Sequence, residues 1–402
     1  MEKKVNINSV LGGKAIGATL YALLFTVYTI VYTLTDNFIL IRISYGLFYA
    51  VSFWYFIKIL IDKNNSKFIR ILNFLFIIII LYGIVSLLNT QSWQGHINKF
   101  TFLRVHFVSI IPIYAFYYFG KNGRIKKEWF ALLFFVFVAD AYLLYYHNRV
   151  LMMENILNAD EGFTNNIGYE WASLLPLIAF FDKKKIIQYV SIVFIMFFVL
   201  TCFKRGAIII SVAGLLYYLL MSMRKTGVLQ KLLIVIMTIG VVVFLYNYFE
   251  SLITSNAFFS HRMEMTIEGD SSGRDDIYSY FFGFLFSGKN GINILFGNGA
   301  FATIKLLGIE AHNDWLEYAI DLGLFGVILY LIYWTRVLKN YFSYSKDNSN
   351  NPILLAMGMV IIMNLLRSFF SMSLDDMSFF SSTVLGYTMA EADNARMKTN
   401  LS

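Results

Sequence analysis

A histidine and three acidic residues lie close together in the segment AHNDWLEYAIDLG, residues 311–323. His312 precedes Asn313, and the acids are Asp314, Glu317 and Asp321. The imidazole of an ordinary histidine has a pKa near about 6.5, so at neutral pH it can take a proton from a hydroxyl group. His312 is therefore a candidate general base, and the acids need a separate explanation.

Helical spacing separates the histidine from the acids. At about 100° per residue, one stripe of a helix would carry small residues below the histidine and the opposite stripe would carry the acids. The first stripe consists of His312, Leu316, Ala319, Gly323 and Gly326. We expect Asp321 to pair with a bundle arginine, first of all Arg367, and to hold the helix in register. The alternative for His312 is an interfacial histidine that binds a loop carbonyl.

Three further positions carry cations suited to binding phosphate. Lys204, Arg205 and Gly206 form a predicted tight turn, and Arg274 follows Ser272 and Gly273. Arginine offers a planar, bidentate contact to phosphate oxygens. Arg367 lies in an apolar run, where a charge costs roughly 2.5 to 3.5 kcal/mol and usually faces a partner or cavity. The alternatives are a turn that binds lipid headgroups for residues 204–206 and a solvated loop arginine at 274.

Two acidic pairs could bind a divalent ion, but neither forms a convincing ligand set. They are Asp275 with Asp276 and Asp375 with Asp376. A calcium or magnesium site needs about six oxygen ligands, which these pairs do not supply. We expect neither a metal ion nor another cofactor.

The elements that must position these residues are predicted to be membrane helices. The chain has 402 residues, of which 58% are hydrophobic and only 14% charged. Apolar runs long enough to cross about 30 Å of hydrocarbon recur along it. We expect one integral membrane domain over residues 1–402, all-α, with about twelve spans. They are placed near 15–34, 37–57, 69–88, 101–119, 129–146, 166–181, 186–202, 206–222, 232–249, 313–334, 353–371 and 378–390.

The basic residues predict the orientation of these spans. Roughly two-thirds of the 33 lysines and arginines fall at the termini and in alternate connections, which places both termini in the cytoplasm of a multi-pass inner-membrane protein. The one long connection, 250–311 between spans 9 and 10, then lies outside the cytoplasm. An amphipathic helix within it, after Ser272, would cap the site. The net charge of +8 is spread over short loops, so we expect no nucleic-acid binding.

The spacing of these residues resembles the O-antigen ligase and polymerase superfamily. The landmarks occur in the same order: KRG at 204–206, SGR at 272–274, FGNG with Gly297 and Gly299, then HN at 312–313 with Leu316, an acid at 321 and glycines at 323 and 326. Asp321 stands where the family usually has glutamate, and Glu317 where glutamine is common. The resemblance covers about residues 200–330, and before that it rests on span count and topology.

The resemblance implies a GT-C-like membrane glycosyltransferase that needs no metal. Its donor would be an oligosaccharide on undecaprenyl diphosphate, and the reaction would occur at the outer face of the membrane. His312 would be the base, Arg205, Arg274, Lys204 and Arg367 would hold the diphosphate, and Asn313, Glu317, Asp321 and the glycines at 297, 299, 323 and 326 would support them.

The acceptor is the point that the motifs leave open. We favour a polymerase of O-antigen or capsule repeat units, whose acceptor is another lipid-linked unit. Membrane lipid, a chain-length regulator and a flippase would then be its partners. The alternatives are an O-antigen ligase, which transfers polymer to a lipid core, and, from another class, a lipid-oligosaccharide flippase or transporter. A transporter usually shows matched halves, which this chain lacks.

Overall fold

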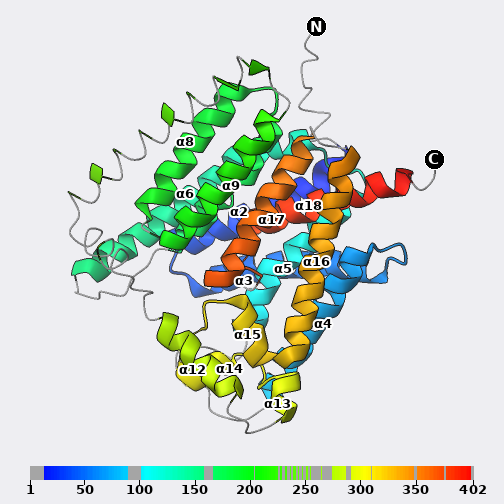
Figure 1. Ribbon diagram of the computed structural model, residues 1–402, viewed down its shortest axis with the longest axis vertical. Coiled ribbons are helices and arrows are strands. Elements are labelled where there is room, and N and C mark those ends of the chain that lie inside the picture. Colours follow the sequence, from blue (N-terminus) through cyan, green and yellow to red (C-terminus); the bar gives the residue numbers. More distant parts are fainter. Residues whose placement is uncertain are drawn as a thin grey trace.

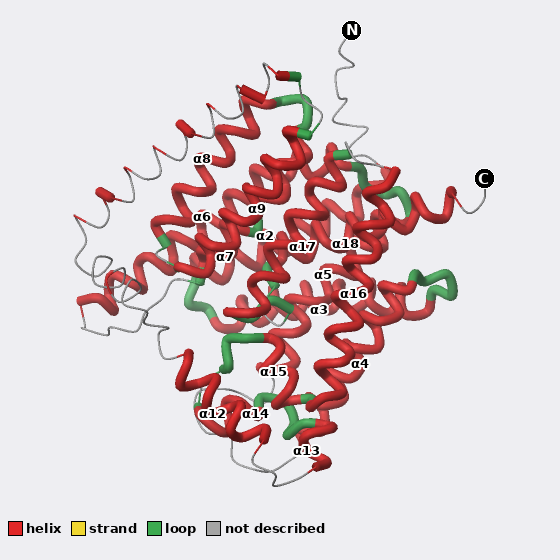
Figure 2. Tube along the Cα trace, viewed as in Figure 1, coloured by secondary structure: helices red, strands yellow, loops and turns green. Residues whose placement is uncertain are grey.

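The structure is a computed structural model that describes most of the chain. The described residues are 13–88, 101–157, 166–202, 204–224, 274–286, 291–308, 310–347, 351–374 and 377–399, with isolated positions between 227 and 264. Among them there are helices and loops but no strand (Figure 2). The predicted all-α class is therefore confirmed for the described part of the chain.

Among the described residues, ten long helices form the main bundle, and the short helices between residues 274 and 321 gather at one end of it (Figure 1). The long helices are α2 (Ile16–Leu34), α3 (Phe38–Ile61), α4 (Lys67–Leu88), α5 (Thr101–Lys121), α6 (Lys127–Leu157), α8 (Lys185–Thr201), α9 (Arg205–Met223), α16 (Gly323–Asp347), α17 (Pro352–Phe370) and α18 (Phe379–Thr399). The short elements are η1 (Gly13–Ala15), α7 (Ile167–Ala172), η2 (Leu175–Phe181), α12 (Arg274–Phe286), α13 (Gly291–Phe296), α14 (Ala302–Leu307) and α15 (Asp314–Asp321). In the view of Figure 1, α12 to α15 lie at the bottom.

Six segments of the described residues are long and apolar enough to cross a membrane. They are Gly13–Leu34, Phe38–Ile61, Lys67–Val85, Lys127–Arg149, Arg205–Met223 and Pro352–Phe370. Apolar side chains remain exposed on them, for example Ile39 at 68%, Leu81 at 50% and Leu216 at 55%. Large exposed apolar surfaces are typical of contact with lipid. The described part of the chain is thus all-helical with candidate membrane spans, and the full number of twelve stays a prediction.

The last predicted span, 378–390, is part of a longer and more central helix. It forms the first half of α18, which runs to Thr399 and packs along α5. Ser382 donates a hydrogen bond to the carbonyl of Ser109, and the hydroxyl of Tyr117 donates to Asp393 at 2.9 Å. Polar residues of α18 are satisfied inside the bundle, which explains why its hydropathy was too low to mark its full length.

Two other predicted spans are interrupted. Residues 166–181 consist of α7, a turn, and the 3-10 helix η2. Residues 313–334 divide into α15 and α16, because Gly323 adopts a left-handed φ of 71° that ends the first helix. Most of the predicted span 232–249 and much of the predicted loop 250–311 lie outside the described residues.

Candidate functional site

His312 lies in a loop directly before α15 and not on the stripe of a helix. Its backbone has a φ of 52°, in the left-handed region that few residues other than glycine adopt. The helix begins with Asn313 as its cap, since the Asn313 side chain accepts the backbone N–H of Leu316 at 3.1 Å. The same side chain donates to the carbonyl of Phe369 at 2.9 Å, at the end of α17. The predicted stripe is therefore wrong at its first residue, and Asn313 fixes where the histidine lies.

Two of the predicted cations act on the His312 ring. Although His312 keeps exposed surface, the atoms around the ring desolvate it, and this lowers its pKa. The positive charges of Lys204 and Arg274 lower the pKa further. Lys204 caps α9 and Arg274 begins α12, so residues far apart in the sequence converge on one histidine.

Arg367 reaches the same region, where its guanidinium group stacks on the ring of Tyr169 in α7. Its guanidinium carbon lies 4.1 Å from the centre of the Tyr169 ring, and the Lys204 ammonium lies 5.8 Å from it. Both Tyr169 and Arg367 are buried. The Tyr169 ring occupies the space that a side chain at Gly206 would need, which accounts for the glycine of the KRG turn. Sequence reasoning missed Tyr169 because it lies in an apolar run with no motif around it.

Helix α12 closes the site on another side. Phe281 of α12 is fully buried against Ala302, Leu316 and Ile320. The hydroxyl of Tyr278 lies 3.5 Å from the carbonyl oxygens of His312 and Phe369. Helices α7, α9, α12, α15 and α17 therefore meet around His312, and Lys204, Arg274 and Arg367 are brought to that region. Arg205 follows Lys204 as the half-buried first residue of α9.

Asp314 is a structural acid. It is fully buried and accepts hydrogen bonds from the Tyr330 hydroxyl at 2.5 Å and from the backbone N–H groups of Ser373 at 2.8 Å and Leu374 at 3.0 Å. These bonds tie α15 to α16 and to the chain that leaves α17. The carboxylate therefore positions the connection between α17 and α18.

Glu317 and Asp321 bind the segment that precedes His312. Glu317 accepts from the Thr303 hydroxyl at 2.6 Å and from the N–H of Ala311 at 2.9 Å. Asp321 accepts the N–H groups of Phe301 at 2.7 Å and Ala302 at 2.8 Å, at the start of α14. Asp321 thus has backbone partners that the sequence did not suggest.

The FGNG turn, residues 296–299, packs against the chain where α15 ends and α16 begins. The N–H of Gly299 donates to the carbonyl of Asp321 at 3.0 Å, and the N–H of Asn298 donates to that of Ile320 at 2.8 Å. A Cβ at Gly297 would collide with the Asp321 backbone, and one at Gly323 would collide with Gly297. Two backbones pass each other here without room for a side chain. At Gly326, a Cβ would meet the side chain of Leu322 within the same turn.

We expect Asp321→Asn to lower the free energy of unfolding by about 1 to 3 kcal/mol, because an amide nitrogen would face a backbone N–H and leave it unsatisfied. Thermal or denaturant unfolding of the purified protein in detergent measures this. Asp36→Asn, in an exposed loop, is the control and should change stability by less than about 0.5 kcal/mol. Equal stabilities of the two variants would contradict the structural role of Asp321.

The acidic pairs considered for a metal do not gather ligands among the described residues. No group of three or more His, Cys, Asp or Glu side chains that could hold an ion occurs there. Asp275 and Asp276 are exposed in the first turn of α12, and residues 375–376 lie outside the described residues.

Comparison with known proteins does not identify the chain. No protein-family model matches it, and no curated protein matches its sequence. The residues around His312 are therefore the basis for assigning a function.

Proposed function

We propose that the chain is a membrane glycosyltransferase that moves glycan from an undecaprenyl-diphosphate carrier to a hydroxyl of another lipid-linked repeat unit, as a polysaccharide polymerase does. One arrangement carries this proposal: α12 and α17 meet at the loop of His312, where Asn313 donates to the end of α17 and the Tyr278 hydroxyl of α12 lies 3.5 Å from the His312 carbonyl. Lys204 and Arg274, which are 70 positions apart, lower the pKa of the histidine there. A base surrounded by cations suits a reaction in which a hydroxyl loses a proton and a diphosphate leaves.

His312 and the basic residues around it would have separate roles in the reaction. The acceptor oxygen forms a bond to the anomeric carbon of the donor sugar, and the bond from that carbon to the diphosphate oxygen breaks. The hydroxyl proton passes to His312, and the negative charge stays on the departing undecaprenyl diphosphate. Lys204 and Arg274, with Arg205 next to Lys204 in the chain, would stabilise that charge. Arg367 would contribute from its place against Tyr169.

The lowered pKa of His312 supports its assignment as the base. The neutral imidazole, which alone can take a proton, predominates at pH 7 when the pKa lies below its usual value.

The function is tested by incubating the purified protein with a lipid-diphosphate-linked oligosaccharide. A ladder of longer lipid-linked products is the expected result. One larger lipid-linked product, formed only when a lipid-core acceptor is added, would identify a ligase instead. Translocation of the substrate in vesicles without any reaction would identify a flippase.

We further propose that the site lies outside the cytoplasm and that both termini lie inside it, with about twelve spans between them. Cys202 is buried, so the chain offers a low background for thiol labelling. Asp276→Cys, on exposed α12, should react with an impermeant maleimide in intact cells, or in spheroplasts where an outer membrane is present. Lys346→Cys, exposed near the far end of α16, should react only after the membrane is permeabilised. The opposite pattern would reverse the topology and refute the proposed mechanism.

A further inference from the structure

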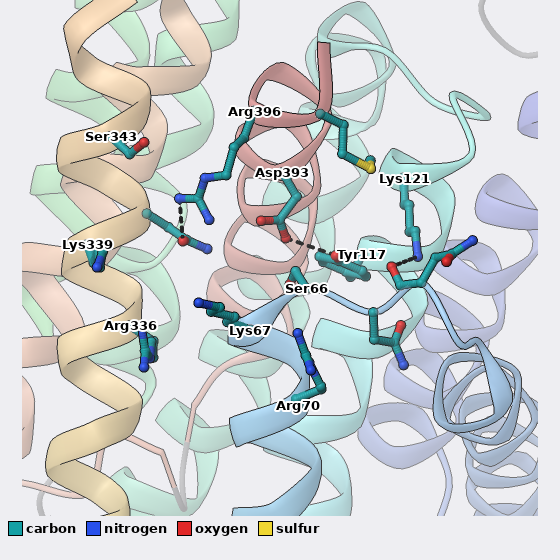
Figure 3. Close-up of a pocket in the computed structure, with 14 residues that line it drawn as sticks. Ser66, Lys67, Arg70, Tyr117, Lys121, Arg336, Lys339, Ser343, Asp393 and Arg396 are labelled. Carbon is teal, nitrogen blue, oxygen red and sulfur yellow. Dashed lines mark hydrogen bonds between the residues drawn. The ribbon is translucent and has the colours of Figure 1, made fainter. Parts of the chain in front are cut away.

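A basic cavity opens at the other end of the bundle, far from His312. It has a volume of about 490 Å³ and is lined by residues of α4, α5, α16 and α18 (Figure 3). Six of the lining residues are basic and one is acidic: Lys67, Arg70, Lys121, Arg336, Lys339 and Arg396, with Asp393. Along α16, Arg336 lies about 20 Å from Gly323, given a rise of about 1.5 Å per residue. The cavity is therefore separate from the proposed active site.

Two of the six cations and the single acid have partners in the protein. Lys121 binds the carboxylate of Asp62 at 2.7 Å, and Arg396 donates to Asn340 at 3.0 Å. Asp393 accepts the hydroxyl hydrogen bond of Tyr117 (Figure 3). The acid of the cavity is thus already engaged with a neighbouring helix.

The other four cations have no acidic partner among the described residues. They are Lys67 and Arg70 on α4 and Arg336 and Lys339 on α16. Figure 3 shows the two pairs on facing helices at the same level of the bundle. Lys67 is also the first residue of α4, where the helix dipole adds positive potential. Four like charges around one cavity repel one another, and an anion bound between them would offset that repulsion.

The surface beside the cavity indicates what carries that anion. On α4 the exposed residues continue from Arg70 to Phe74 and Leu81, at helical spacing. On α16 a matching exposed row consists of Leu324, Ile328 and Leu331, below Thr335 and Lys339. The centre of the Phe74 ring lies 6.3 Å from the centre of the Phe325 ring of α16, so the two helices meet along this apolar surface. A basic cavity thus lies at one end of two apolar stripes. The cavity suits the charged headgroup of a lipid, and the stripes suit its acyl chains.

We propose that this cavity binds the phosphate headgroup of an anionic phospholipid, whose acyl chains lie along the outer faces of α4 and α16. Basic pockets between membrane helices on the cytoplasmic side are suited to such headgroups. The lipid would neutralise the two cation pairs and hold α4 against α16. Under the proposed topology it comes from the cytoplasmic leaflet, but the binding itself does not depend on the reaction at His312.

Native mass spectrometry of the purified full-length protein in detergent tests the proposal, with phosphatidylglycerol and phosphatidylcholine as probes. Phosphatidylglycerol should bind at least about tenfold more tightly than phosphatidylcholine. The double variant Arg336→Gln/Lys339→Gln should weaken phosphatidylglycerol binding by about tenfold or more, since each cation near a lipid surface contributes about 1 kcal/mol. Lys67→Gln/Arg70→Gln removes the facing pair and should have a similar effect.

The matched control removes the same charge from the same end of the protein. Lys63→Gln/Lys346→Gln alters two exposed lysines that do not line the cavity and should change binding by less than about twofold. An equal loss in this control, or equal binding of both lipids by the unaltered protein, would overturn the proposal. Full displacement of the lipid by soluble glycerol phosphate at equal concentration would also overturn it, because the ligand would then be a soluble anion.

Discussion

Replacing His312 by alanine is expected to reduce turnover by about 10² to 10⁴-fold, the range for loss of a general base. Expression, membrane insertion and donor binding should be retained, because His312 lies in a loop and Asn313, not His312, caps α15. Product formation from a lipid-linked oligosaccharide, measured under single-turnover conditions, reports the loss.

The matched control is His147→Ala. His147 lies on α6, where its ring contacts Tyr32, and it is outside the site. This variant should keep near-normal turnover. If His312→Ala polymerises at a rate within a few-fold of the unaltered protein, the assignment of the base is wrong.

The pH dependence of the activity is a second test of His312 as the general base. The base works in its neutral form, so activity should fall as the pH drops through the His312 pKa, which lies below its usual 6.5. Lys204→Gln removes a charge that lowers this pKa, so the acid limb of the pH–rate profile should move to higher pH. An acid limb that does not move in this variant would show that another group controls it.

Gly323→Ala is expected to lower the free energy of unfolding by about 3 kcal/mol or more. A left-handed φ costs an alanine roughly 1 to 2 kcal/mol. The new Cβ would also lie 2.6 Å from the Leu295 carbonyl oxygen and collide with the backbone of Gly297, neither of which can rotate away. Unfolding in detergent measures the change, and activity should fall with it, because the turn also fixes the segment before His312.

A glycine in an ordinary helix provides the comparison. Gly46 lies within α3, and a Cβ there would meet no atom within 4 Å. Gly46→Ala should leave stability unchanged or raise it by up to about 1 kcal/mol. Similar behaviour of Gly323→Ala and Gly46→Ala would show that the FGNG turn does not pack against Gly323 as described.

The sequence by itself determined the helical class. Long apolar runs can satisfy their backbone hydrogen bonds only as helices in lipid, so composition and run length suffice to predict them. The cap at Asn313 is also local, within three residues, but the predicted stripe that included His312 placed the start of α15 too early. The glycines of FGNG indicate a turn, because glycine adopts positive φ angles at little cost wherever it occurs.

The tertiary structure alone decided the partners of the acids and the position of the histidine. Asp314 binds the chain near Ser373, and Asp321 binds the start of α14, across separations of 59 and 19 or 20 residues. These partners are backbone N–H groups, which no sequence pattern reveals. The break at Gly323 was hidden by the continuous apolar run around it, and the basic cavity arises only where α4 meets α16. Local energies determine helices, caps and turns. The packing of those helices determines which backbone groups each acid binds.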